Sequence, residues 1–352
     1  MSKGICVIIP AYNERECIGD TLTSLRSQTL LPEMIVVVDD GSKDGTGEYI
    51  KKNFPEVVVI RPVKNLGSKA KAQNFALFYR KNDGSLLIKS RFIVSIDADT
   101  SVNLDGIELL SKPLRENRKI KASCGTVIPR NLDNAYTLGR LGEYLCAFAF
   151  PKRIQQAYGG NILILSGCFG CYRIGPLRRR RGWHTKTMAE DMDLTASYHK
   201  KCLKVAYVHE AICRPIEPFN WRTYSTQMTR WNASFFQIIS LHWKTYVNRP
   251  VGIFLIVCFL DAFIGGAIWY LTPLWMFLAG FKEWIKWFIL VDLFLVSIPI
   301  VYMGIKLKIL KEAIKSIPFI YFLRSLNYYF WCRAFYLEWI KKEHLKVFIK
   351  GH

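Results

Sequence analysis

Four short apolar runs in the first hundred residues constrain the fold of this chain more than any other feature. They are too short for helices and rich in β-branched residues, as expected of buried strands. Between them lie amphipathic segments such as Ala70–Arg80. Because strands alternate with helices, the sequence predicts a parallel sheet with covering helices. The runs are Cys6–Ile9, Ile35–Val38, Val57–Ile60 and Phe92–Ile96.

Polar side chains follow three of these runs at the point where each predicted strand ends. The carboxyl ends of parallel strands meet at one edge of an open sheet, where ligands bind. We therefore expect these residues to line one crevice. They are Asn13 and Glu14, then Asp39 and Asp40, then Asp97 and Asp99.

Two long apolar stretches follow residue 250. Residues 251–271 are interrupted only by Asp261, and residues 285–305 only by Lys286 and Asp292. Each has about the 20 residues needed to cross a bilayer, so both are predicted to be transmembrane helices. The two acids are expected to face each other, to line a polar path, or to hydrogen-bond to a neighbouring helix.

The segments around these stretches suggest a topology. A polar turn is predicted at Phe281–Trp284, between the two helices, and a basic interfacial helix at residues 306–316. Because Lys- and Arg-rich segments stay on the cytoplasmic side of a membrane, we expect this helix and the large domain to lie in the cytoplasm. Residues 317–340 are aromatic but carry charges, and form a re-entrant, interfacial or spanning segment. We favour the first two, because a single crossing would place the Lys-rich tail Lys341–Lys350 outside. The predicted domains are 1–220, 221–250 and 251–352.

The net charge of +21 suits a polyanion, an anionic membrane surface or a phosphate-bearing substrate. No signal peptide is expected, because Met1–Lys3 leads straight into the first predicted strand. The ten cysteines are therefore expected to be reduced thiols on the cytoplasmic side.

Asp97 and Asp99 form an Asp-x-Asp pair directly after the fourth apolar run. Two carboxylates at one strand end provide the hard oxygen ligands that Mg²⁺ or Mn²⁺ takes together with a diphosphate. By itself, the pair is weak evidence for a metal site, and a solvated turn explains it better.

Six further segments accompany this pair, and in their order they resemble the membrane-embedded family 2 glycosyltransferases. That family includes hyaluronan, chitin and cellulose synthases and bacterial poly-N-acetylglucosamine synthases. Gln155–Gly159 looks particularly like the hyaluronan and chitin synthase branch. The segments are Val7–Glu14, Val38–Thr46, Asn65–Ala70, Ser166–Arg173, Ala189–Asp193 and Gln227–Trp231.

The resemblance implies a GT-A (Rossmann-like) α/β fold that binds a UDP-sugar with Mn²⁺ or Mg²⁺. Asp39 or Asp40 would accept a hydrogen bond from the uracil, and Asp99 would be the metal ligand. Asp97 would lie beside the ribose or diphosphate, and Lys69 would add positive charge. The remaining residues expected to bind the nucleotide are Pro10, Ala11, Tyr12 and Glu14.

Asp191 is the predicted general base. Inverting transfer needs one carboxylate to take the proton of the acceptor hydroxyl as the new bond forms. Asp193 is the alternative base if the family motif aligns with this segment two residues later. An acidic start to a helix at Glu190–Asp193 would explain the same residues without catalysis.

Gln227, Arg230 and Trp231 are spaced i, i+3 and i+4 and share one face of a predicted helix. Such a face would bind diphosphate oxygens and stack against a sugar ring. An interfacial helix would explain Trp231 but not the other two residues.

Two motifs have less specific interpretations. The pair Cys168 and Cys171 lacks a second cysteine pair at zinc-site spacing, so a zinc site is not expected. The family resemblance implies that this segment is a backbone turn near the acceptor. The run Arg178–Arg181 either binds phospholipid head groups or forms a solvated loop.

These observations predict a multi-pass cell-membrane enzyme with a cytoplasmic catalytic domain and no nucleic-acid partner. It would transfer a sugar from UDP-N-acetylglucosamine or UDP-glucose to a growing β-linked polysaccharide. One alternative is transfer of a single sugar to a lipid, as in ceramide glucosyltransferases; another is a non-catalytic scaffold or channel. The chain is expected to have fewer transmembrane helices than large synthases, so a product channel would require a homo-oligomer or a minimal pore.

Overall fold

The structure, a computed structural model, describes residues 4–185 and 187–344. It comprises two compact units. The first contains Met1–Arg130 and Gln156–Ile216, and the second contains Asn131–Gln155 and the chain from Glu217 onward. The domain boundaries predicted at residues 220 and 250 stay predictions, and most of the predicted tail Lys341–Lys350 lies outside the described residues.

The first unit is built on an eight-stranded sheet with the order β3-β2-β1-β4-β7-β6-β8-β5. Strands β1 to β4 are parallel to one another, as the apolar runs predict. Strand β7 pairs antiparallel with both β4 and β6, and β5 pairs antiparallel with β8. The strands are β1 Ile5–Ala11, β2 Met34–Asp39, β3 Val58–Ile60, β4 Phe92–Ile96, β5 Ser101–Val102, β6 Ile120–Val127, β7 Phe169–Arg173 and β8 Lys204–Arg214.

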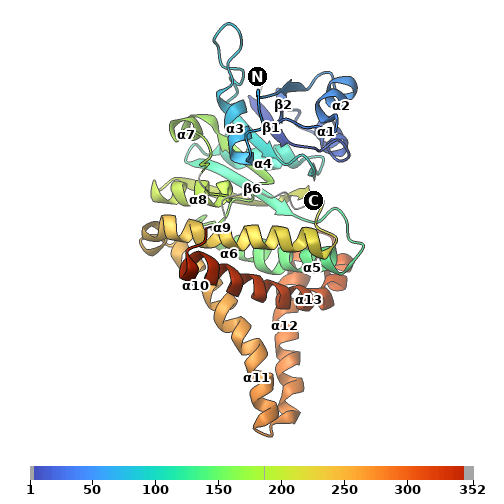
Figure 1. Ribbon diagram of the computed structural model, residues 1–352, viewed down its shortest axis with the longest axis vertical. Helices are drawn as coiled ribbons and strands as arrows, with labels where there is room; N and C mark the ends of the chain where they lie inside the picture. Colours follow the sequence, from blue (N-terminus) through green and yellow to red (C-terminus); the bar gives the residue numbers. More distant parts are fainter. Residues whose placement is uncertain (1–3, 186, 345–352) are drawn as a thin grey trace. The chain divides into compact units, whose positions relative to one another are not determined.

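Helices cover both faces of this sheet (Figure 1). Alternate residues of β1 enter two separate cores, with Val7 on one face and Ile8 on the other. Helices α1, α2 and α4 contribute to the first core, and α3, α7 and α8 to the second. This burial on both faces explains the near-continuous apolar runs of the central strands. The helices are α1 Ile18–Arg26, α2 Thr46–Asn53, α3 Lys69–Phe78, α4 Gly106–Glu116, α7 Ile174–Arg179 and α8 Glu190–Lys200.

The second unit is helical. Helix α13 packs against α5, α9 and α12. The segments predicted at 306–316 and 317–340 lie largely in this one helix and its π-helical extension η3. The remaining elements are α5 Ala135–Glu143, η1 Tyr144–Ala149, α6 Phe150–Ala157, which continues into the first unit, α9 Trp221–Val247, α10 Val251–Phe259, η2 Leu260–Gly265, α11 Gly266–Leu278, α12 Lys282–Lys306, α13 Leu310–Phe335 and η3 Tyr336–Lys341.

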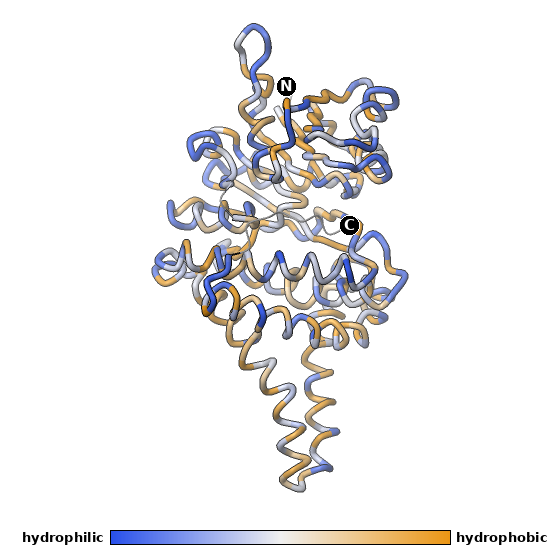
Figure 2. Tube along the Cα trace, in the orientation of Figure 1, coloured by the Kyte–Doolittle hydropathy of each residue, from blue (hydrophilic) through white to orange (hydrophobic). Residues whose placement is uncertain are grey.

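An apolar hairpin extends from this helical unit (Figure 1). Val251–Leu278 and Lys282–Lys306 are long and apolar enough to cross a membrane, and only 22% of the most apolar window of each is buried. Figure 2 shows the mostly hydrophobic colouring of both arms. Both helices exceed the predicted stretches, because the first continues through Pro273 and the second begins at Lys282.

Candidate active site

Hydrogen bonds join the loops that follow β1 and β2. The backbone N–H of Asn13 donates to Ser42 Oγ at 3.0 Å, and that of Glu14 donates to Thr46 Oγ1 at 2.9 Å. In return, the N–H of Lys43 donates to Asn13 Oδ1 at 2.8 Å. Asn13 adopts φ 55°, a left-handed conformation that asparagine tolerates better than most residues. The two strand ends are thus held as one rigid rim.

The residues predicted to line the base pocket have different roles in this rim. Tyr12 is 39% exposed, so its ring is available to a ligand, whereas Ala11 is buried. Glu14 is also buried, and the Cys17 thiol donates to its carboxylate at 2.9 Å. Pro10 is half-buried within β1.

The two aspartates after β2 are both buried but have different partners. Asp39 is 1% exposed and accepts the N–H of Ser42 at 2.9 Å and the Arg61 guanidinium at 3.1 Å. Asp40 accepts the N–H of Leu66 at 2.7 Å. Burial raises the pKa of Asp40 above its ordinary value, although hydrogen bonds from the Leu66 and Gly67 backbone oppose the shift. Arg61 belongs to no sequence motif, and the motif analysis missed it.

Lys69, the first residue of α3, lies at the centre of a charged cluster. Its ammonium group pairs with Asp97 at the end of β4 and with Glu190 at the start of α8, where the N–O distance is 3.5 Å. It also donates to the carbonyl of Gly167 at 3.1 Å. Burial alone would lower the pKa of Lys69, but the carboxylates of Asp97 and Glu190 outweigh burial and raise it. The cluster joins four of the predicted motifs.

Asp191 is held beside this cluster by backbone N–H groups. Its Oδ2 accepts from Gly167 at 2.9 Å, and its Oδ1 accepts from Met192 at 2.7 Å. A Cβ on residue 167 would lie 2.9 Å from Asp191 Oδ2, so glycine permits this close approach. Gly167 therefore contacts Lys69 through its carbonyl and Asp191 through its N–H.

Asp193 has a different environment, although it lies only two residues away. It is 1% exposed, and its carboxylate pairs with Arg180. The same guanidinium donates to Ser197 Oγ at 2.8 Å. Asp193 thus links α8 to the segment after α7.

The structure changes the interpretation of the arginine run and adds a contact to Cys168. Arg178 donates to the carbonyls of Leu77 and Ile88, and Arg180 pairs with Asp193. Neither a phospholipid site nor a solvated loop describes these two arginines, because their guanidinium groups bond within the first unit. Cys168 has its Sγ 3.7 Å from the Sγ of Cys213, in β8.

The Asp-x-Asp segment supplies a limited donor set for a cation. Asp99 is half-buried, and its Oδ1 accepts from Thr100 Oγ1 at 2.9 Å. Its carbonyl accepts from Arg130 at 2.9 Å. No group of three or more His, Cys, Asp or Glu residues suited to a metal occurs among the described residues. This donor set fits a cation whose remaining ligands come from a bound diphosphate and water, as is usual for Mg²⁺.

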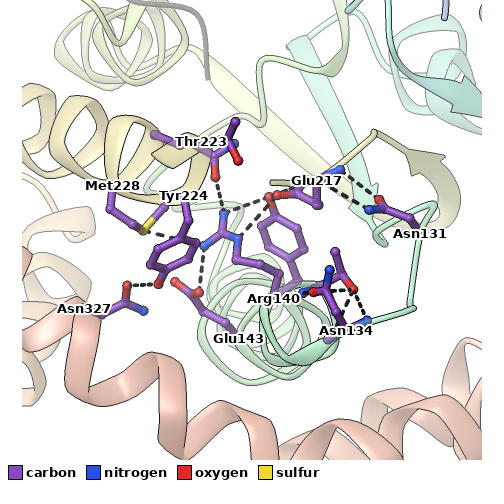
Figure 3. A network of polar contacts seen from close by, with 12 residues as sticks. Asn131, Asn134, Arg140, Glu143, Glu217, Thr223, Tyr224, Met228 and Asn327 are labelled. Atoms are coloured by element: carbon purple, nitrogen blue, oxygen red, sulfur yellow. Dashed lines mark hydrogen bonds and ion pairs between the residues drawn. The ribbon is translucent and has the colours of Figure 1, made fainter. Parts of the chain in front are cut away.

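In the second unit, two residues of the predicted α9 face contact a buried arginine, Arg140, whose polar network is shown in Figure 3. Asn220 caps α9, because its side chain accepts the N–H of Thr223. The Arg140 guanidinium, from α5, donates to Gln227 Oε1 at 3.3 Å and lies 4.5 Å from the centre of the Trp231 ring. Gln227, Arg230 and Trp231 are all half-buried.

Arg140 is itself fully enclosed. It is 0% exposed and pairs with Glu143 at 2.7 Å and with Glu217 at 3.4 Å, and it donates to the Tyr144 hydroxyl at 3.0 Å. The sequence analysis did not identify this network, because Arg140 matches no motif and lies 87 positions before Gln227.

The hairpin contains a second charged contact. Asp292 of α12 accepts from Arg324 of α13 at 2.9 Å and from the Tyr321 hydroxyl at 2.8 Å. Of the alternatives left open for Asp292, the structure contains the hydrogen bond to a neighbouring helix.

Comparison with known proteins identifies the family. Residues 6–181, half of the chain, match Glycosyl transferase family 2. The chain belongs to this family. Its fold also resembles the mannosyltransferase from Pyrobaculum calidifontis, whose structure contains GDP-Man and Mn²⁺. The TM-score is 0.52 and the identity 16%, over 90% of this chain and 87% of that one.

Curated relatives of this family 2 chain include two bacterial polysaccharide synthases. It is 26% identical to the poly-beta-1,6-N-acetyl-D-glucosamine synthase of Staphylococcus epidermidis, over 72% of this chain. It is 29% identical to the hyaluronan synthase of Streptococcus pyogenes, over 70% of this chain. The matches span 60% of the length of each relative. The resemblance inferred from the motifs and the GT-A fold are both confirmed.

Proposed function

We propose that this protein is an inverting glycosyltransferase that transfers a sugar from a UDP-sugar to a growing β-linked polysaccharide at the membrane. The family and the two synthase relatives support this activity. The observation that carries the proposal is the cluster around Gly167. This residue contacts Lys69 through its carbonyl and Asp191 through its N–H, which brings a cation and a candidate base together.

Nucleotide binding is assigned to the rim and to Lys69. The exposed ring of Tyr12 would lie against the uracil, and Asp40 would accept the base N–H. Asp39 would stabilise the rim through Arg61, since both of its oxygens already have partners within the unit. The Lys69 ammonium would contact the diphosphate, exchanging part of its pairing with Asp97 and Glu190 for phosphate oxygens.

The transfer itself requires one base. Asp191 would accept the proton of the acceptor hydroxyl while that oxygen attacks the anomeric carbon and UDP departs from the opposite side. A carboxylate has about four acceptor positions, and the N–H groups of Gly167 and Met192 occupy two. These bonds fix the carboxylate and leave capacity for the substrate proton.

A divalent cation, Mn²⁺ or Mg²⁺, would be held by Asp99 together with the diphosphate. When bound, it would neutralise the charge that develops on the UDP leaving group. Asp97 lies two residues earlier and would orient Lys69 toward the same diphosphate.

The second unit would bind the acceptor and the membrane. Gln227, Arg230 and Trp231 would contact diphosphate or sugar oxygens and stack against a sugar ring. The apolar hairpin would cross the bilayer, with the first unit in the cytoplasm, and α13 would be an interfacial or re-entrant helix.

The test is UDP release by purified protein supplied with UDP-N-acetylglucosamine or UDP-glucose, followed by mass analysis of the product. We expect metal-dependent release and a ladder of masses one sugar apart. If mass analysis instead finds a lipid that carries a single sugar, the protein glycosylates a lipid and does not make a polymer. Release no faster than with Asp191→Asn would contradict catalysis and favour a scaffold, and undiminished release in EDTA would contradict the metal.

A further inference from the structure

Arg140 is enclosed so completely that its role must be exerted through neighbouring residues. Its guanidinium is fully buried and has two carboxylate partners, Glu143 and Glu217, together with the Tyr144 hydroxyl. The two acids neutralise its charge locally. A substrate phosphate therefore has no access to this guanidinium, and Arg140 does not bind the diphosphate itself.

The remaining contacts of Arg140 are with the α9 face that the proposed function uses. It donates to Gln227 Oε1 at 3.3 Å, and its guanidinium stacks 4.5 Å from the centre of the Trp231 ring. An arginine has donors only, so the carboxamide must turn its oxygen toward Arg140. The Nε2 group of Gln227 is then the end of the amide left for a ligand.

We infer that Arg140 is a positioning residue that fixes Gln227 as a hydrogen-bond donor to substrate and holds the Trp231 ring in place. This inference rests on the proposed function. The ligand atom facing Gln227 Nε2 must be an acceptor oxygen, since the amide presents only N–H groups in that direction. A diphosphate oxygen of the donor and a hydroxyl oxygen of the acceptor sugar share this chemistry.

Gln227→Glu tests the orientation of the amide. The carboxylate keeps an oxygen toward Arg140 but removes the N–H that would reach the substrate. We expect the transfer rate to fall at least about tenfold, the usual cost of one lost hydrogen bond. The melting temperature should stay within a few degrees of wild type. Wild-type transfer by this variant would overturn the inference.

A double-mutant comparison tests the positioning role. Arg140→Lys keeps the charge between the two acids but loses the planar fork. We expect it to lower transfer about tenfold in the wild-type background and by a clearly smaller factor in Gln227→Ala, where only the Arg140 contact with the Trp231 ring is left to lose. Equal losses in both backgrounds would overturn the inference, because Arg140 would then act elsewhere.

Tyr224→Phe is the matched control. Tyr224 lies on α9, and this change removes only the 2.6 Å hydrogen bond from its hydroxyl to Asn327 of α13, while the ring and the hydrogen bond from Arg140 to Gln227 remain. Transfer by this variant should equal that of wild type at a similar loss of melting temperature. If it loses transfer as Arg140→Lys does, general packing of α9 explains the effect and the inference fails.

Measurements of UDP affinity distinguish the two oxygens that Gln227 Nε2 could face, one on the diphosphate and one on the acceptor sugar. If Nε2 faces the diphosphate, UDP affinity falls in both Gln227→Glu and Arg140→Lys. If Nε2 faces the acceptor, UDP affinity is retained and transfer falls relative to hydrolysis. If the wild-type protein does not turn over UDP-sugars at all, both the proposed function and this inference are wrong. Impaired Gln227→Ala with unimpaired Arg140→Lys would remove the inference alone.

Discussion

Lys69 in the first unit and Arg140 in the second are both buried cations held by two carboxylates, yet they are held in different ways. The Lys69 side chain is 15% exposed, and its partners Asp97 and Glu190 come from separate elements. Arg140 has no exposure and donates to five side chains, counting the sulfur of Met228. The first arrangement is open to substrate and the second is closed.

The difference follows from the chemistry of the two cations. An ammonium group is a compact charge on a flexible stem, so Lys69 can exchange a carboxylate for a phosphate oxygen. A guanidinium is a rigid fork that holds several acceptors in fixed geometry. The comparison suggests that the first unit uses its cation on the substrate and the second uses its cation to shape the protein.

The largest expected effect separates the carboxylate proposed as the general base, Asp191, from a structural carboxylate on the same helix, Asp193. Asp191→Asn should lower transfer by about 10² to 10⁴, the usual contribution of a positioned base, with UDP-sugar affinity nearly unchanged. Asp193→Asn should lower the melting temperature instead, because it weakens the pair with Arg180. Steady-state kinetics and calorimetry on both variants measure this. Equal loss of nucleotide binding and turnover in Asp191→Asn would place Asp191 in the donor pocket.

Replacing Lys69 tests whether its charge acts on the substrate. Lys69→Met should lower turnover by about 10²-fold, comparable to removing one donor that stabilises a leaving group. Lys69→Arg should recover little, because a rigid planar fork does not reproduce the compact ammonium charge that can exchange a carboxylate for a phosphate oxygen. The turnover number at saturating donor and the affinity for UDP are the measurements. Full activity of Lys69→Arg would remove the contrast with Arg140.

Trp231→Ala should have a smaller effect that is confined to the acceptor. Loss of a stacking surface costs about 0.5–1.5 kcal/mol, so transfer should fall severalfold to about tenfold. UDP-sugar binding and slow hydrolysis to water should persist. Both rates are measured on one preparation. A parallel fall of hydrolysis, transfer and UDP affinity would assign the indole to the donor site or to helix packing.

The smallest expected effect is a shift in pH dependence. Burial raises the pKa of Glu190, although Lys69 opposes the shift and Asp191 adds to it. On acidification, Glu190 therefore takes up its proton at a higher pH than an ordinary glutamate, and its pairing with Lys69 is lost there. Turnover should decline in that range in wild type, and the decline should move to lower pH in Glu190→Gln. Identical acid limbs would show that Glu190 does not titrate during turnover.

The sequence predicted those parts of the molecule that depend on local patterns. Each of the four apolar runs lies in or overlaps a parallel strand, and the side chains after β2 and β4 occupy the expected strand ends. The predicted helix face of Gln227 and Trp231 is present in α9. Alternation, strand length and helical spacing are carried by neighbouring residues, so sequence patterns report them well.

Features that depend on distant partners were not predictable. Nothing local separates Asp191 from Asp193, since both stand in the first turn of α8. They differ in their distant partners, Gly167 for Asp191 and Arg180 for Asp193. Arg140 matches no motif, because its partners Glu217 and Gln227 come from a later part of the chain. The first apolar helix also continues past Leu271, since a proline is tolerated inside such helices.

The position of Asn131–Gln155 in the chain has a practical consequence for protein production. These residues lie between two stretches of the first unit but belong to the second, where α5 packs against α13. A fragment ended at Ile216 would therefore keep α5 while losing α13, and would also leave Arg140 without Glu217. Such a fragment would expose an apolar helix face and is expected to aggregate. A soluble version of the first unit therefore needs two changes: the chain must end at Ile216, and a short linker must replace residues 131–155.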